Sequence, residues 1–181
     1  MKMMPTLEQL LRVPQVDSGY SFDLSPDGTR LAFSWNMTGA WEIYELSLDD
    51  TTLSGGAGED RSRVITAPPG GKFRPRYSPD GKRLAYALDL DGSESFHIAI
   101  FDFGTGQHTD LTPDIAFAHQ PNISWSPDGR DLAVLSDAGG LGLTIRPWSS
   151  EGIDREACVG VTEPHGRNRP PCAANRGTVA S

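Results

Sequence analysis

One tetrapeptide occurs three times in this chain and constrains its fold more than any other feature. The three copies read Ser-Pro-Asp-Gly and occupy Ser25–Gly28, Ser78–Gly81 and Ser126–Gly129. The spacing is 53 residues from Pro26 to Pro79 and 48 residues from Pro79 to Pro127. Two polar residues and an apolar stretch follow each copy. Because a period of about 40–50 residues is typical of architectures that repeat a four-stranded sheet, we expect such a repeat here.

The tetrapeptide suits a tight turn between two antiparallel strands. Proline presets φ at the second position of a type I turn, and glycine is favoured at the fourth. Glycine can take the positive φ that a bulged hairpin requires, and the aspartate can accept backbone N–H groups. A catalytic role for Ser25, Ser78 or Ser126 would need a base beside each serine, and the sequence supplies no distinct base for each copy. We therefore interpret all three as turn residues and predict no catalytic residue.

Alternation of apolar and polar residues around these turns predicts an all-β chain. The expected fold is a partial β-propeller of about three four-stranded antiparallel blades, with a short N-terminal helix and an irregular C-terminal tail. The predicted divisions are an N-terminal segment over 1–16, blades over 17–148 (17–68, 69–113 and an incomplete 114–148), and a tail over 149–181. The helix is expected over residues 5–12, where Thr6 can cap it and Gln9 can complete a capping box.

The repeat pattern stops after Trp148. Residues 151–181 have no aromatic side chain and no strand-like alternation, so their composition is that of an unfolded segment. One hypothesis is that this tail comes from a shifted reading frame or a mispredicted gene end. Translating the coding DNA in the other two frames would test it, since a continuing pattern of turns and strands should then reappear.

Charge and cysteine content narrow the function classes. The net charge is −8 and no run of lysine or arginine stands out, which argues against nucleic-acid and anionic-membrane partners. The N-terminus lacks the continuous apolar segment of a secretion signal, so we expect a cytoplasmic protein. The only cysteines, Cys158 and Cys172, do not have metal-site spacing.

Other candidate sites each have a simpler structural interpretation. The acidic stretch Asp89–Glu94 lacks the remaining ligands of a calcium loop and is interpreted as a turn between strands. Gly55–Asp60 is glycine-rich but lacks a following Lys-Ser/Thr, so it is interpreted as a mobile loop. Two remaining groups have irregular spacing, namely His97, His108 and His119, and Cys158, His165 and Cys172. The sequence therefore predicts no cofactor and no metal.

Large aromatic side chains follow the strand periodicity. We expect them to fill the layers between blades, with an aromatic ligand-binding ring as the less favoured alternative. They are Phe33, Trp35, Trp41, Tyr44, Phe73, Tyr77, Tyr86, Phe101 and Trp125.

The repeats resemble the blades of TolB-like proteins and of the amino-terminal propeller in the prolyl oligopeptidase family of serine peptidases. The resemblance rests on Leu24–Phe33, Tyr77–Tyr86 and Trp125–Gly129. The opening segment, Thr6–Val16, is similar to the start of the acylaminoacyl-peptidase-like branch, in which a short helix precedes the first blade. Together these segments fall within residues 5–148.

This resemblance implies that the propeller screens peptides on their way to a separate α/β-hydrolase domain with a Ser-Asp-His triad. The sequence contains no Gly-x-Ser-x-Gly turn, so this chain is expected to be a non-catalytic fragment of a parent serine peptidase. The parent's partners would be its own hydrolase domain and peptide substrates. Since three blades leave a face uncovered, the fragment is expected to self-associate. The alternative is a TolB-like module that binds proteins and has no enzymatic activity.

Overall fold

The computed structural model describes residues 13–17, 19, 21–48, 62–115, 122–136 and 144–150. These residues form strands, turns and bends, and none of them belongs to a helix that could cross a membrane. The strands are β1 (Phe22–Leu24), β2 (Arg30–Trp35), β3 (Glu42–Ser47), β4 (Ser62–Val64), β5 (Gly71–Tyr77), β6 (Arg83–Asp89), β7 (Phe96–Asp102), β8 (His108–Asp110), β9 (Ile123–Trp125), β10 (Asp131–Ser136) and β11 (Thr144–Ser149).

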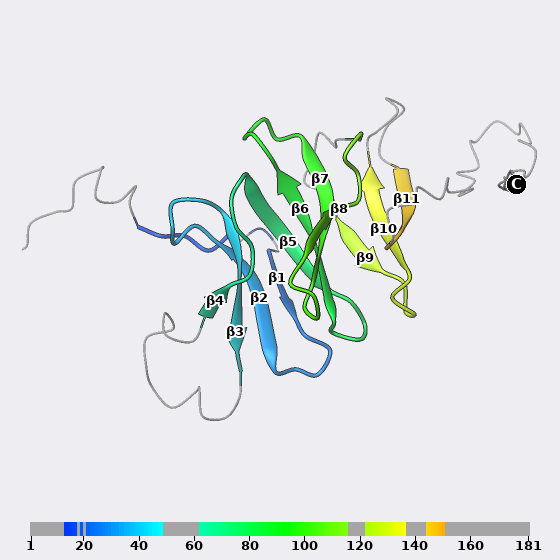
Figure 1. The fold of residues 1–181 in the computed structure, drawn as a ribbon, viewed down its shortest axis with the longest axis horizontal. Helices are drawn as coiled ribbons and strands as arrows, with labels where there is room; N and C mark the ends of the chain where they lie inside the picture. Colours follow the sequence, from blue (N-terminus) through cyan, green and yellow to red (C-terminus); the bar gives the residue numbers. More distant parts are fainter. Residues whose placement is uncertain are drawn as a thin grey trace, which may run out of the picture.

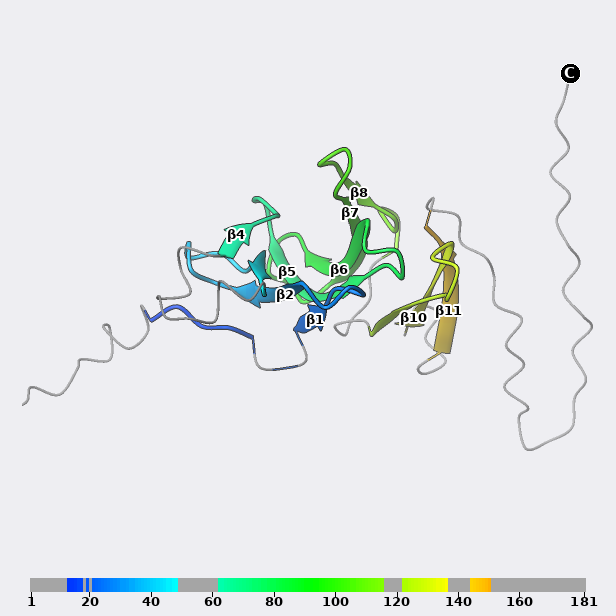
Figure 2. The same ribbon diagram turned by 90° about the horizontal axis from the view of Figure 1, so that it is seen from below.

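The strands form three consecutive antiparallel sheets, one for each copy of the repeated turn. The strand orders are β1-β2-β3-β4, β5-β6-β7-β8 and β11-β10-β9, so each sheet is a simple meander. Figures 1 and 2 show the three sheets succeeding one another along the molecule, and we call them blades 1, 2 and 3. The prediction of an all-β partial propeller is confirmed. The helix predicted over 5–12 and the tail beyond residue 150 lie outside the described residues.

The repeated turns have the geometry that their chemistry predicts. Gly28, Gly81 and Gly129 have φ values of 73°, 67° and 69°. In the first turn the Gly28 N–H donates to the Ser25 carbonyl at 2.8 Å, and the Thr29 N–H donates to the Asp27 carboxylate at 3.0 Å. The other two turns repeat both bonds. Proline, aspartate and glycine thus each have the role in the turn that the sequence assigned to them.

Replacing Gly81 with valine is expected to lower the free energy of unfolding by about 1–3 kcal/mol, because a branched side chain is strained at positive φ. Gly28→Val is the matched control. A Cβ at Gly28 would meet nothing within 4 Å, whereas one at Gly81 would lie 3.1 Å from Arg30 Nη2. Urea titration should therefore show a larger loss for Gly81→Val, and an unaffected Gly81→Val would refute the turn geometry.

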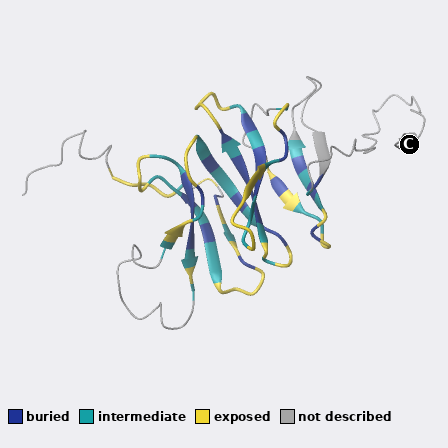
Figure 3. Cartoon of the chain, in the orientation of Figure 1, coloured by how far each residue is buried: buried dark blue, intermediate teal, exposed yellow. Residues whose placement is uncertain are grey.

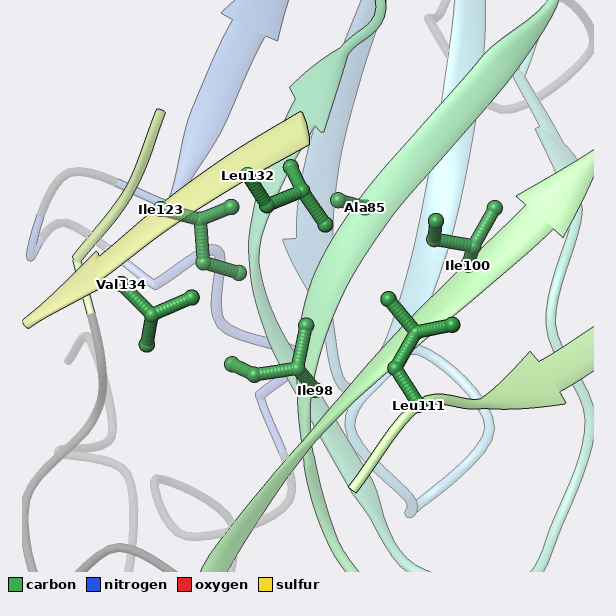
Figure 4. Close-up of a cluster of buried hydrophobic side chains, with 7 residues drawn as sticks. All are labelled: Ala85, Ile98, Ile100, Leu111, Ile123, Leu132 and Val134. Carbon is green, nitrogen blue, oxygen red and sulfur yellow. The ribbon is translucent and has the colours of Figure 1, made fainter. Parts of the chain in front are cut away.

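Two clusters of buried side chains fill the layers between the blades. Between blades 2 and 3, Ala85 from β6 and Ile98 from β7 meet Leu132 and Val134 from β10 (Figure 4). Between blades 1 and 2, Ala32 from β2 and Ile43 from β3 pack against buried side chains of blade 2 that include Leu84 from β6. Successive residues of a strand face opposite sides of its sheet. Blade 2 is therefore covered by apolar contacts on both faces.

Three of the aromatic side chains predicted to lie between blades occupy the other side of blade 1. Phe33, Trp35 and Tyr44 contact one another, with ring centroids 5.1–6.1 Å apart. Since Ala32 and Ile43 face blade 2, their neighbours along each strand face away from it. Within the described residues these three side chains therefore lie on the face of blade 1 that is turned away from blade 2, and their place in a layer between blades stays a prediction.

We call this side of blade 1 its front face. Its residues are cross-strand partners in β1, β2, β3 and β4, so their side chains lie on the same side of the sheet. They are Phe22, Leu24, Leu31, Phe33, Tyr44, Leu46 and Val64. Phe22, Leu24 and Val64 are 58%, 51% and 48% exposed, and Figure 3 shows exposed positions along β1 and β4. The front face is therefore an apolar surface whose side chains on β1 and β4 are exposed, while Tyr44 is buried.

We propose that the isolated chain self-associates through this front face, because exposed apolar patches drive association. Phe22→Lys is expected to weaken self-association about tenfold in sedimentation equilibrium, which corresponds to about 1.4 kcal/mol. Leu90→Lys is the control, since Leu90 is also exposed, at 42%, but lies in the turn after β6. Equal effects of the two substitutions would show that association does not depend on the front face.

Candidate functional site

The three blades converge at their first strands, β1, β5 and β9. β5 contacts β1 and β2 on one side and β9 on the other, as can be followed in Figure 1. We call β1, β5 and β9 the inner strands. Their contacts with one another are largely polar, whereas the layers between β2, β6 and β10 are apolar. We call the line of polar contacts between the inner strands the polar edge.

The middle inner strand, β5, is interrupted by a bulge. Its pairing with β6 shifts register between Phe73 and Arg76. Arg74, within the bulge, has a φ of 54°, which is uncommon for a residue other than glycine. Pro75 follows it and is almost fully buried. Bulges of this kind redirect side chains and occur often beside functional sites.

The bulge directs two arginines towards the neighbouring blades. Arg74 Nη1 donates to the Asn122 side-chain oxygen, just before β9 of blade 3. Arg76 Nη1 donates to the Phe22 carbonyl of blade 1 at 3.0 Å. The Arg76 carbonyl in turn accepts the Trp125 Nε1–H at 2.9 Å. These bonds join all three blades through β5.

An acidic side chain completes this polar edge on blade 1. Asp23 Oδ2 accepts the Tyr77 N–H at 2.8 Å across the boundary between blades 1 and 2. Burial raises the pKa of the Asp23 carboxyl above its ordinary value, although the Tyr77 N–H and the Arg76 guanidinium act in the opposite direction. The inner edge thus combines a partly buried carboxyl with two guanidinium groups, which is a suitable surface for polar peptide groups.

A buried ion pair between β3 and the start of β5 also links blade 1 to blade 2. Lys72 Nζ lies 3.0 Å from the Glu42 carboxylate, and both side chains are at most 3% exposed. Lys72 Nζ also donates to the Ala67 and Gly70 carbonyls at 2.7 Å and 2.9 Å. Thr66 Oγ1 donates to Glu42. All three ammonium protons therefore have acceptors, as a buried charge requires.

A second carboxylate, Glu45, joins the same two blades near the repeated turns. Its carboxylate accepts hydrogen bonds from Arg30 Nη1 at 3.2 Å, from Arg63 Nη2 at 2.6 Å and from the Tyr77 hydroxyl at 2.8 Å. Burial, followed by the bond to Glu45, raises the pKa of Tyr77 far above its ordinary value. The Tyr77 hydroxyl therefore serves as a hydrogen-bond donor to Glu45.

The repeated serines direct their hydroxyl groups into their own turns. Ser25, Ser78 and Ser126 each donate to the aspartate two residues later at 2.6 Å. Each hydroxyl also accepts the backbone N–H five residues later at 2.9 Å. Through these two hydrogen bonds, each serine hydroxyl stabilises its own turn.

Ser78→Ala is expected to raise the pKa of Asp80. The pKa of that carboxyl is lowered chiefly by the Ser78 hydroxyl and next by the Lys82 N–H, and the equivalent bonds lower the pKa of Asp27 to about 2. A depressed carboxyl pKa stabilises the fold above the unfolded pKa, and this contribution is lost as the pH falls through the folded pKa. Carboxyl-carbon NMR titration measures the shift, with Asp27 and Asp128 as internal controls.

The other sequence candidates do not come together. His97 lies 2.8 Å from Asp110, whereas His108 lies 2.9 Å from the Tyr86 hydroxyl. Burial, with Lys72 nearby, lowers the pKa of His108. Asp89 accepts the N–H groups of Gly92 and Glu94, as in a turn between strands. Within the described ranges, no three His, Cys, Asp or Glu side chains gather as a metal site. Gly55–Asp60, His119, Cys158, His165 and Cys172 lie outside those ranges.

Sequence reasoning missed the inner-strand arginines and the buried Lys72–Glu42 pair. A signal for the first was present, since a proline inside a strand pattern, here Pro75, often marks a bulge. No comparable signal existed for the pair, because Glu42 and Lys72 belong to different sheets.

Comparison with known proteins links this fold to peptidases. No family model matches the chain. It is 32% identical over 100 residues to the uncharacterized peptidase YuxL of Bacillus subtilis, covering 53% of this chain and 15% of that protein. It is 34% identical over 97 residues to dipeptidyl aminopeptidase BI of Pseudoxanthomonas mexicana, covering 54% of this chain and 12% of that protein. The chain thus spans less than a sixth of each relative.

Solved structures show the same fold. TolB from Acinetobacter baumannii is similar with a TM-score of 0.60 and 26% identity, over 75% of this chain and 31% of that one. The tricorn protease is similar with a TM-score of 0.54 and 19% identity, over 74% of this chain and 12% of that one. The chain is thus similar to peptidases in sequence and to TolB in the fold of its propeller blades.

Proposed function

We propose that these blades are the part of a serine peptidase that screens peptides before they reach a separate α/β-hydrolase domain. The observation that carries this proposal is the similarity to two peptidases over about 100 residues of propeller sequence. This chain contributes binding and steric selection, and the hydrolase domain of the parent contributes the nucleophile. In this assignment the chain itself is not an enzyme.

The inner strands supply the surface for such screening. Arg74, Arg76 and Asp23 lie at the edge where the three blades converge, and the Arg74 backbone is fixed in a conformation that side chains seldom adopt. Strained backbone at positive φ persists where the surrounding structure enforces it and is frequent at functional sites. Guanidinium groups held in this way can bind peptide carbonyl or carboxylate oxygens.

The coding DNA that surrounds this chain provides the first test. We expect further Ser-Pro-Asp-Gly blades and then a Gly-x-Ser-x-Gly segment in a strand-turn-helix context. In the enzyme so encoded, Arg74→Ala should change kcat/KM for long peptides several-fold and leave a dipeptide chromogenic substrate unaffected. Equal effects on both substrates would contradict screening, because a change at the hydrolase centre would not depend on peptide length.

The alternative function is a TolB-like module that binds proteins and carries no hydrolase. It is favoured by the likeness to TolB, which has the higher TM-score and identity of the two structures compared. Surrounding DNA that encodes further blades but no Gly-x-Ser-x-Gly segment would support this alternative and exclude the peptidase.

A further inference from the structure

The inner strands carry a positive charge within a chain that is acidic as a whole. Lys72 is paired with Glu42. The other charged residues of these strands are Arg74 and Arg76, both half-buried, and Asp23. Two guanidinium groups therefore face one carboxylate here, whereas the net charge of the chain is −8. A local positive field of this kind attracts anions to the place where the three blades converge.

Buried contacts fix the backbone from which the Arg74 side chain projects. The Arg74 N–H donates to Ser21 Oγ at 3.3 Å, and Ser21 Oγ donates to the Asp17 carboxylate. Ser21 and Pro75 are both fully buried. These contacts hold the positive φ of Arg74 in place. Because the side chain starts from a fixed position, a ligand that binds to it loses less entropy in ordering the site.

Arg74 and Asn122 together present hydrogen-bond donors. Arg74 Nη1 donates to the Asn122 side-chain oxygen across the boundary between blades 2 and 3. A guanidinium carries five N–H donors and no acceptor. Because the oxygen of Asn122 faces Arg74, its amide nitrogen points the other way and brings two further N–H donors. Asn122 is exposed, so this pair is accessible to a group that accepts hydrogen bonds.

Among the groups of a peptide, a carboxylate is the acceptor that suits this pair best. It carries a negative charge, and its two oxygens can accept from the guanidinium and the amide together. A peptide carbonyl offers one oxygen and no charge. An ammonium group brings only donors and is repelled by Arg74. Charge-assisted hydrogen bonds are about twice as strong as neutral ones, so the pair should distinguish a carboxylate from an uncharged acceptor.

We propose that Arg74 and Asn122 form a carboxylate subsite at the polar edge, through which the blades select peptides with an acidic side chain or a free carboxyl terminus. This inference rests on the proposed screening function and names the class of peptide that is screened. Asp23 does not occupy the subsite, because it accepts the Tyr77 N–H on the blade 1 side, whereas Asn122 precedes β9 of blade 3.

Fluorescence anisotropy with three short peptides of equal length tests the subsite. Each peptide has a neutral dye at its amino terminus. The first ends in a free carboxylate and has no other charge, the second has an internal glutamate and a carboxamide end, and the third has glutamine in place of that glutamate. We expect the full chain to bind at least one carboxylate peptide about tenfold more tightly than the glutamine peptide. Which of the two binds identifies the source of the carboxylate.

Arg74→Gly should reduce the affinity for the carboxylate peptides to that for the glutamine peptide. Glycine adopts the φ of Arg74, 54°, without strain, so this variant is expected to fold. Arg130→Gln is the matched control, because it removes the same charge from an exposed arginine that lies beside the third repeated turn. The control should keep the preference for the carboxylate peptides.

Asn122→Asp provides a second variant that does not alter the bulge. It places a carboxylate of the protein beside the Arg74 guanidinium, where it competes with the carboxylate of the ligand. Asn122 is exposed, so the variant should fold even if Arg74→Gly does not. We expect it to lose the preference for carboxylate peptides as well.

Equal affinity of the chain for the three peptides, or no binding of any of them, would overturn the carboxylate subsite. A preference that survives both Arg74→Gly and Asn122→Asp would also overturn it, because the carboxylate would then bind elsewhere. None of these results decides whether the blades screen peptides, which the coding DNA and the dependence on peptide length test separately. Coding DNA without a hydrolase segment would reject screening, and the measured preference of this chain for carboxylates would remain.

Discussion

Replacing Lys72 with methionine is expected to lower the free energy of unfolding by about 3–5 kcal/mol, the usual cost of removing one partner from a buried ion pair. The substitution leaves the Glu42 carboxylate, 2% exposed, without its cation. It also removes the donor to the Ala67 and Gly70 carbonyls. Because these acceptors connect the end of blade 1 to the start of blade 2, we expect the contact between the two blades to loosen first.

Urea denaturation, monitored by tryptophan fluorescence, measures this loss of unfolding free energy. Arg130→Met is the matched control, since Arg130 lies 4.0 Å from Asp128 with both side chains well exposed. Surface pairs of this kind contribute about 0–1 kcal/mol. Adding Glu42→Leu to Lys72→Met should recover part of the stability, because no unpaired charge is then buried. Similar losses for Lys72→Met and Arg130→Met would contradict a buried, fully bonded ammonium.

Replacing Gly70 with alanine is expected to cost about 3–4 kcal/mol, from strain at positive φ and a backbone clash together. Gly70 has a φ of 80°, and a Cβ at this position would lie 2.3 Å from the Asp89 carbonyl oxygen and 2.9 Å from Leu90 Cα. Backbone atoms cannot rotate away as a flexible side chain can. The Gly70 carbonyl would also move away from Lys72 Nζ, 2.9 Å from it in the native chain.

Gly92→Ala separates the two causes. Gly92 has nearly the same φ, 78°, and a Cβ there would meet nothing within 4 Å. Its substitution should therefore cost only the backbone strain, about 1–2 kcal/mol. The difference between the two unfolding free energies measures the clash at Gly70. Equal losses of unfolding free energy for the two substitutions would contradict the close approach of β6 to Gly70.

Much of the fold could be predicted from local sequence. The Ser-Pro-Asp-Gly turns form as their chemistry requires, down to the positive φ of Gly28 and the bonds to Asp27. The apolar stretch that follows the first turn lies in β2, Arg30–Trp35. Both features depend on neighbours within a few positions, and period-2 alternation specifies a strand without reference to the rest of the chain.

Less of the candidate site could be predicted from the sequence. Pro75 carried a hint of the bulge, but the direction in which Arg74 and Arg76 point depends on how β5 lies between β1 and β9. The arginine that recurs after two of the three turns was visible as a pattern, whereas its acceptor was not. That acceptor is a backbone carbonyl of the next blade, 51 residues away for Arg30.

The repeat, the turns and the strands follow from the sequence alone, because each depends on short-range backbone preferences and side-chain alternation. Which face of each strand is covered depends instead on how the blades pack against one another. Phe33 and Tyr86 occupy equivalent repeat positions, yet Tyr86 is buried against blade 1 and Phe33 faces the open side. This difference arises because the burial of a side chain depends on contacts between blades. A residue's own repeat cannot specify whether a neighbouring blade is present.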